Sequence, residues 1–119
     1  MSTKSQEKYK KILITGAGGF IGRNLFEQLN NEYDITAIDI KDIDLLDSSK
    51  VFDYLKNNQF DSIIHTATYD AVVRFSTKDS TKVLENNLKM FFNITRGKDH
   101  FDRMIYFGSG AEFGRENWV

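Results

Sequence analysis

The chain has 119 residues, of which 40% are hydrophobic and 28% charged, and its formal net charge at pH 7 is -1. This is the length of one small domain, and the balanced charge gives no electrostatic basis for binding nucleic acid or an anionic membrane. Cysteine is absent, which excludes disulfides and thiolate metal sites, and His65 and His100 lie too far apart in sequence to indicate a metal site. No apolar run approaches the length of a membrane span. We therefore expect a cytoplasmic protein with no metal, nucleic-acid or membrane partner.

Short apolar runs and helical spacings predict the elements in chain order. Residues 1–10 are polar and are expected to be a flexible leader. Four strands are predicted, at 11–15, 33–39, 61–68 and 103–109. Three helices are predicted between them: 20–31; a second capped by Ser48 or Ser49 and ending at Asn57–Asn58; and a third over roughly 81–96, capped by Asp79 or Ser80 and ended by Gly97 in a left-handed conformation.

Strands that alternate with helices imply parallel pairing through right-handed crossovers. We predict an α/β fold, a doubly wound parallel sheet of the Rossmann type with strand order 3-2-1-4. Residues 11–119 would form a partial domain of this type, truncated after the fourth strand. That strand, with its apolar "MIYF" at 104–107, would be an exposed edge with unpaired backbone groups, so we expect a homo-oligomer formed along it.

A glycine cluster, "TGAGGFIG" at 15–22, falls between the first strand and the first helix. Gly16 would allow the tight exit from the strand, Gly19 the close approach of a pyrophosphate, and Gly22 the packing of the helix on the sheet. The start of this helix, at Phe20 and Ile21, offers backbone N–H groups and the positive end of its dipole to a phosphate. The alternative is an ordinary glycine-rich turn that binds nothing.

Asp39 ends the predicted second strand, 17 residues after Gly22. A carboxylate at this place accepts hydrogen bonds from the adenosine ribose and repels a 2′-phosphate, so the cofactor is expected to be NAD rather than NADP. A solvated Asp at a strand end is the rival interpretation, since Lys41 and Asp42 follow directly. Arg23 could also meet a phosphate, which weakens the preference.

Five motifs in order resemble those of the extended short-chain dehydrogenase/reductase family, whose members include NAD(P)-dependent nucleotide-sugar epimerases, dehydratases and reductases. They are "TGAGGFIG" (15–22), "DLLD" (44–47), "HTAT" (65–68), "ENNL" (85–88) and "YFGSGAEFG" (106–114). The short link from Asp39 to the acidic motif resembles the keto-sugar reductase branch of the family.

The resemblance implies roles for residues beyond the glycines. Asp44 and Leu45 would contact the adenine, and Thr66 and Ala67 would lie along the cofactor. Ser109 would be catalytic, hydrogen-bonding the sugar C4 oxygen while that oxygen alternates between carbonyl and alcohol. The alternative for Ser109 is an ordinary loop serine.

Two further polar residues are open to more than one interpretation. Leu84, Leu88 and Phe91 lie near Asn87 in the sequence and predict an apolar helix face, on which an amide needs partners. The resemblance implies that Asn87 holds backbone or water near the cofactor and active site, and the alternative is that it ties down a neighbouring loop. His65 has the chemistry of an acid/base, but the resemblance implies a structural role.

The chain departs from the family at one motif. The family's acid/base is a Tyr followed four residues later by a Lys, and none of the five tyrosines here has that lysine. We therefore expect the cofactor-binding half of an NAD(P)-dependent nucleotide-sugar epimerase, dehydratase or reductase, with hydride transfer to or from a sugar carbon in the full-length parent. The alternatives are a non-catalytic dinucleotide-binding or regulatory module and a fragment that binds nothing.

Overall fold

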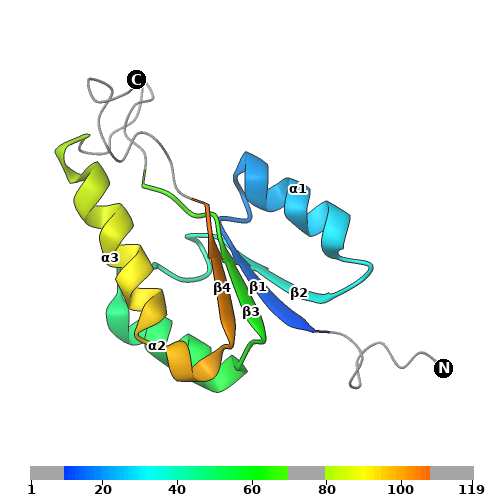
Figure 1. Ribbon diagram of the computed structural model, residues 1–119. Coiled ribbons are helices and arrows are strands. Elements are labelled where there is room, and N and C mark those ends of the chain that lie inside the picture. Colours follow the sequence, from blue (N-terminus) through cyan, green and yellow to red (C-terminus); the bar gives the residue numbers. More distant parts are fainter. Residues whose placement is uncertain (1–9, 70–79, 108–119) are drawn as a thin grey trace.

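The computed structural model describes residues 10–69 and 80–107, in which strands and helices alternate as predicted (Figure 1). The strands are β1 (Lys11–Thr15), β2 (Asp34–Ile38), β3 (Ser62–His65) and β4 (Arg103–Tyr106). The helices are α1 (Phe20–Leu29), α2 (Ser48–Asn58) and α3 (Val83–Thr95), with short 3-10 turns at Ser80–Lys82 and Lys98–His100. In this part of the chain, no helix combines the length and the apolar character needed to cross a membrane.

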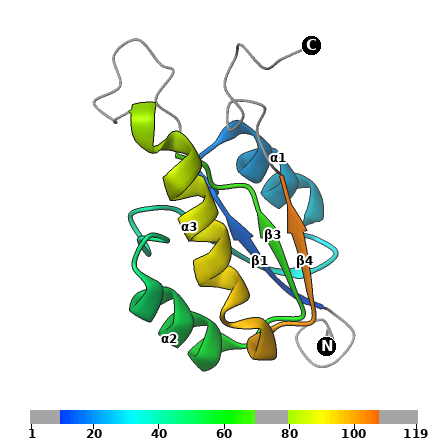
Figure 2. The same cartoon turned by 60° about the vertical axis from the view of Figure 1, so that its left-hand side comes forward.

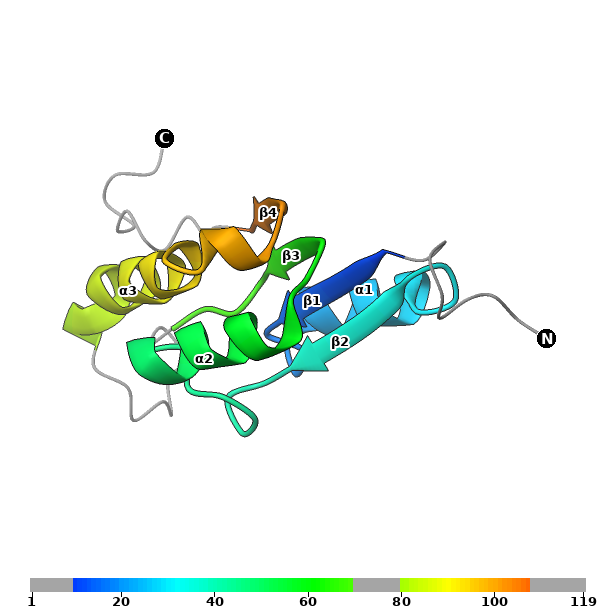
Figure 3. The same ribbon diagram turned by 90° about the horizontal axis from the view of Figure 1, so that it is seen from below.

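The four strands form one parallel sheet in the order β2-β1-β3-β4, seen edge-on in Figure 3. The doubly wound α/β class is confirmed, whereas the expected order 3-2-1-4 is wrong, because β3 pairs with β1 and not with β2. The reason is that α1 covers one face of the sheet and α2 the other. A right-handed crossover advances in opposite directions along a sheet when its helix changes face, so β3 returns past β1.

The face under α1 is covered by a small core. Ile12 and Ile14 of β1 and Ile64 of β3 are buried there, and Leu25 and Phe26 of α1 pack against them. Because successive side chains of a strand point to opposite faces, the alternate positions of β1 and β3 belong to the other core.

The opposite face of the sheet carries the larger core, and Figure 2 shows α3 and α2 lying on this face. Leu13 and Ile63 contribute from the sheet, and both are almost completely buried. The helices contribute Val51, Leu55, Met90 and Ile94 to the same cluster. Two helices cover this face and one covers the other, so burial across the sheet is unequal.

The helix ends differ from the predicted ones. Asp47 caps α2, its carboxylate accepting a hydrogen bond from the Lys50 N–H at 3.2 Å, in place of Ser48 or Ser49. Gly97 has a φ of -92° and is not left-handed, and the chain continues from it into the turn at Lys98–His100. A Cβ at Gly97 would lie 2.7 Å from Leu55 Cδ1, so this glycine allows α3 to approach α2 closely. Asp79, the other expected cap of α3, lies outside the described residues.

β4 lies at an edge of the sheet and, within the described residues, pairs with β3 alone. Ile105 is in register with Ile64, and its side chain therefore points to the α1 face. It is 47% exposed, because α1 covers the inner strands and leaves the end of the sheet open. The fourth strand is thus the exposed, partly apolar edge that its sequence predicted.

Candidate functional site

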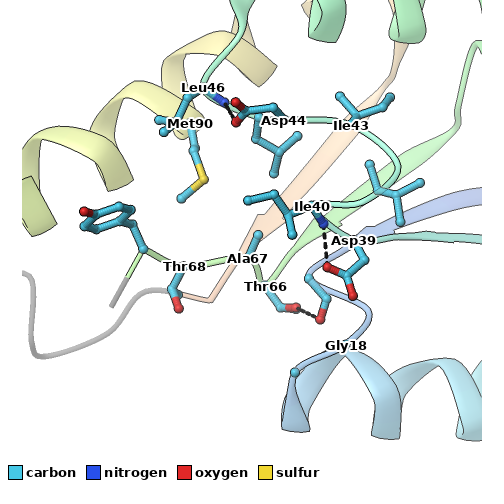
Figure 4. A pocket seen from close by; sticks show the side chains of 15 residues that line it. Gly18, Asp39, Ile40, Ile43, Asp44, Leu46, Thr66, Ala67, Thr68 and Met90 are labelled. Atoms are coloured by element: carbon cyan, nitrogen blue, oxygen red, sulfur yellow. Dashed lines mark hydrogen bonds between the residues drawn. The ribbon is translucent and has the colours of Figure 1, made fainter. Parts of the chain in front are cut away.

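A cavity of about 470 Å³ opens at the carboxyl ends of the strands (Figure 4). Its walls come from the glycine turn after β1, from the loop after β2 between Asp39 and Leu46, and from Thr66–Tyr69 after β3. Met90 of α3 reaches into it from a fourth side. The cavity lies where the strand order reverses between β1 and β3, which is the place where open α/β sheets bind their ligands.

The glycine turn fits tightly against the end of β3. Gly16 has a φ of +75°, a conformation that favours glycine, and a Cβ there would lie 2.6 Å from the Ala67 nitrogen and 2.7 Å from Thr66 Oγ1. The Thr66 hydroxyl donates a hydrogen bond to the Thr15 carbonyl at 2.6 Å. A Cβ at Gly22 would collide with the Gly16 carbonyl, so α1 packs directly on the turn. Larger residues at Gly16 or Gly22 would push the wall segments apart.

The start of α1 faces the cavity with backbone groups. Gly19 is the N-cap residue, and no side chain caps the helix. The first helical hydrogen bond runs from the Arg23 N–H to the Gly19 carbonyl, so the N–H groups of Phe20 and Ile21 have no acceptor within the helix. A Cβ at Gly19 would meet only the Gly16 carbonyl oxygen, at 3.4 Å, which leaves open space above this residue. The arrangement suits an anion.

Asp39 and Asp44 both line the cavity from the loop after β2. The Asp39 side chain lies beside Gly18, and its carboxylate accepts a hydrogen bond from the Ile40 N–H (Figure 4). Asp44 accepts a hydrogen bond from the Leu46 N–H at 3.0 Å, so its carboxylate shapes the loop. Leu45 is buried against the larger core. The two residues expected to meet the adenine are thus brought to the same wall as Asp39.

Asn87 of α3 is buried and ties down a neighbouring loop. Its Oδ1 accepts a hydrogen bond from the Tyr69 N–H at 2.8 Å, and its Nδ2 donates to the Tyr69 carbonyl at 2.9 Å and to the Val83 carbonyl at 2.8 Å. Asn87 is not among the cavity-lining residues, which include Tyr69 itself. The apolar face expected around it was wrong, because Leu84 and Leu88 are exposed. Its buried neighbours on α3 are Val83, Met90, Asn93 and Ile94.

Asn93 is a residue that the sequence reasoning missed. It is 2% exposed, and its Nδ2 donates a hydrogen bond to the Leu45 carbonyl at 2.9 Å. The spacing gave no signal for it, because six residues place Asn93 about 120° around α3 from Asn87. A buried amide on a helix must find a partner, and this partner belongs to the cavity wall.

His65 lies at the end of β3, completely buried, with its ring stacked on Tyr106. Thr15 Oγ1 accepts the N–H groups of Thr66 at 3.1 Å and Ala67 at 3.3 Å, so its own proton is directed to His65 Nδ1, 2.7 Å away. The imidazole is therefore neutral, with its proton on Nε2, an atom that has no hydrogen-bond partner within residues 10–69 and 80–107. Burial lowers the pKa of His65 from 6.5 to about 4. This geometry fits the structural role better than acid/base work.

Two further expectations concern Ser109 and the absence of a metal site. Ser109 lies outside the described residues, so the structure does not place it relative to the cavity. Within residues 10–69 and 80–107, no group of three His, Asp or Glu side chains is arranged to hold a metal ion.

Comparisons with known proteins match most of the chain. A family model described as the NAD dependent epimerase/dehydratase family matches residues 12–118. The chain is 29% identical over 109 residues to GDP-L-colitose synthase from Yersinia pseudotuberculosis, covering 89% of this chain and 35% of that protein. Among solved structures, dTDP-4-dehydrorhamnose reductase from Bacillus anthracis in complex with NADP is 30% identical with a TM-score of 0.67, covering 79% of this chain and 34% of that one.

A second solved structure agrees in fold. GDP-mannoheptose C4 reductase from Campylobacter jejuni with NADP bound has a TM-score of 0.76 at 20% identity, covering 89% of this chain and 35% of that one. The chain thus spans about a third of the length of these relatives. The resemblance seen in the sequence motifs is confirmed at the level of the family and of the fold.

The buried neutral His65 predicts an acid-sensitive fold. The unfolded chain binds a proton near pH 6.5 and the folded chain only near pH 4, so the free energy of unfolding should fall as the pH drops between these values. The full effect is about 3 kcal/mol, from the size of the pKa shift. Urea unfolding of the wild type and of His65→Asn, compared at pH 7 and pH 5, should show about 2 kcal/mol of this loss in the wild type alone. Equal pH dependence in the two proteins would contradict the prediction.

Proposed function

The chain belongs to the NAD-dependent epimerase/dehydratase family, and from that premise we propose that its cavity binds a nicotinamide dinucleotide as the cofactor-binding part of a nucleotide-sugar reductase. The observation that carries the proposal is the open glycine turn, with the Asp39 side chain beside its Gly18, at the point of strand reversal. The residues fit the group, because Gly19 leaves room beside uncapped helix N–H groups where a pyrophosphate would lie.

Each wall has a proposed part in holding the cofactor. Gly16, Gly19 and Gly22, with the N–H groups of Phe20 and Ile21, would surround the pyrophosphate. Asp39 would bind the adenosine ribose. The adenine would contact Asp44 and Leu45, and the rest of the extended cofactor would lie along Thr66 and Ala67. Asn87 would not touch the cofactor and would act by fixing the backbone at Tyr69.

The form of the cofactor is proposed to be NADP(H), against the preference for NAD expected from Asp39. The two solved relatives described above hold NADP, one of them at 30% identity. The Asp39 carboxylate already accepts the Ile40 N–H, and the exposed cations Arg23 and Lys41 lie close to the turn and the loop in sequence. A 2′-phosphate would need such cations to offset the carboxylate.

The proposed reaction belongs to a longer polypeptide than the part described. When bound, the nicotinamide would exchange a hydride with a sugar carbon, and the names of the relatives point to GDP- or dTDP-linked keto-sugars as substrates. Ser109 would donate a hydrogen bond to the sugar oxygen.

A cytoplasmic location is part of the same proposal, since nicotinamide dinucleotides are available there. The second candidate, a non-catalytic dinucleotide-binding module, differs in showing binding without turnover.

Self-association through β4 is the proposed quaternary arrangement. Ile105 of β4 is 47% exposed and Phe107, directly after the strand, is 38% exposed, and an exposed apolar edge strand pairs readily with another strand. A second copy of the chain offers the same edge.

Gly19→Ala should weaken dinucleotide binding while leaving the fold intact. The added methyl meets ordinary contact distance within the chain but occupies the space proposed for the pyrophosphate. Calorimetric titration with NADP should show an affinity weaker by about tenfold or more, which is about 1.4 kcal/mol or more. Asn31→Ala, at the far end of α1, is the control. An unchanged affinity in the glycine variant, with saturable binding in the wild type, would refute the proposed site.

Asp39→Asn should shift the choice between the two cofactor forms. It removes the charge that opposes a 2′-phosphate and keeps an oxygen able to accept the Ile40 N–H. The ratio of NADP to NAD affinities should rise by about tenfold. Asp34→Asn makes the same charge change at the opposite end of β2 and should leave the ratio unchanged. No change in the ratio would mean that Asp39 does not face the adenosine ribose.

Ile105→Lys should yield a monomer if the chain associates through β4. A lysine on the edge strand places a charge in the proposed contact. Light scattering at micromolar concentration should give a dimeric or larger mass for the wild type and a monomeric mass for the variant. A monomeric wild type would end this part of the proposal.

A further inference from the structure

We propose that Asn93 is a positioning residue for the adenosine side of the cavity, acting by holding the Leu45 carbonyl in place. The inference rests on the proposed function, because it assigns Asn93 to the binding of the same dinucleotide. Asn93 does not line the cavity itself, so it can act only through the loop that it contacts.

The loop after β2 is folded by hydrogen bonds of its own. The Asp42 N–H donates to the Asp39 carbonyl at 2.9 Å, the Leu46 N–H to the Asp44 carboxylate at 3.0 Å, and the Asp47 N–H to the Asp44 carbonyl at 3.0 Å. These bonds span at most three residues, so they define the turns of the loop. They do not define how far the loop stands from the opposite wall of the cavity.

The contact from Asn93 supplies a long-range anchor. It joins residues 48 apart in sequence, and both the amide and the Leu45 side chain are buried. Arg96 donates a hydrogen bond from Nη1 to Asn93 Oδ1 at 3.1 Å, which turns the amide so that its N–H faces the Leu45 carbonyl. The loop is therefore attached to α3 at the residue next to Asp44.

The same helix anchors the opposite wall. Asn87 binds both backbone groups of Tyr69, the last described residue of the wall after β3. Asn87 and Asn93 are six residues apart, which is about 9 Å along a helix axis. Met90, midway between them, lines the cavity. α3 thus fixes the two walls relative to each other, and its Met90 side chain points into the cavity (Figure 4).

The experiment compares Asn93→Asp with the wild type. Aspartate has the shape of asparagine and keeps an acceptor for Arg96, but it cannot donate to the Leu45 carbonyl. The probe is ADP-ribose, which carries the adenosine and the pyrophosphate and lacks the nicotinamide. We expect its dissociation constant to rise by about tenfold. Backbone hydrogen exchange at Leu46 and Asp47 should become faster, while exchange in β1 stays unchanged.

A matched control is Asn58→Asp, which removes an amide donor to a backbone carbonyl of its own helix, at the far end of α2. It should leave ADP-ribose binding unchanged, whatever it does to the melting temperature. All affinities are measured well below the melting temperature of each variant. A merely structural Asn93 would lower the melting temperature without changing affinity or exchange in the loop, and that result would overturn the inference.

Two outcomes separate this inference from the proposed function. A wild type that binds neither ADP-ribose nor NADP refutes the function, whereas a wild type that binds both, with equal affinity in Asn93→Asp, refutes only the role of Asn93. If Asn93→Asp does not fold, Arg96→Ala decides, because it removes the exposed partner that orients the amide. We expect ADP-ribose affinity to fall about threefold in that variant, and an unchanged affinity would overturn the inference.

Discussion

The reversal of the sheet between β1 and β3 is the constraint on which the rest of the structure depends. Because crossovers are right-handed, placing α1 on one face and α2 on the other sends β2 and β3 to opposite sides of β1. The chain leaves the two central strands in different directions, and the space between their carboxyl ends stays open. The glycine turn and Thr66–Tyr69 border this space because each directly follows one of those strands.

Local sequence predicted which segments form strands and helices, but not how the strands are ordered. The apolar runs and helical spacings are properties of short windows, and β1 matched its predicted bounds. The order depends on which face each helix covers, and the amphipathic pattern of α2 is compatible with either. The predicted left-handed Gly97 was also wrong, since the chain continues from Gly97 into the turn at Lys98–His100, where the His100 N–H donates to the Gly97 carbonyl at 2.8 Å.

The candidate site, like the fold, was predictable from the sequence only in part. Its glycine turn and Asp39 were predictable, because a strand, a turn and a helix in succession carry their own spacing. The contribution of α3 was predictable only in part: the alternative in which Asn87 ties down a neighbouring loop matches its hydrogen bonds to Tyr69, whereas the bond from Asn93 to Leu45 was missed. Such bonds leave no periodic signal. The preference for NAD rested mainly on the Asp39 carboxylate, and the solved relatives that hold NADP do not support it.

The pairing of β1 on both sides also bears on the way the chain folds. Lys11 pairs with Asp34 across a short crossover, whereas Ile12 pairs with Ser62 only after a second crossover has formed. The entropy lost on closing a loop grows with its length, so the β1–β2 unit closes at lower entropic cost than the β1–β3 pair. The binding crevice needs both pairs, so it is complete only when the β1–β3 pair, with its larger entropic cost, has formed.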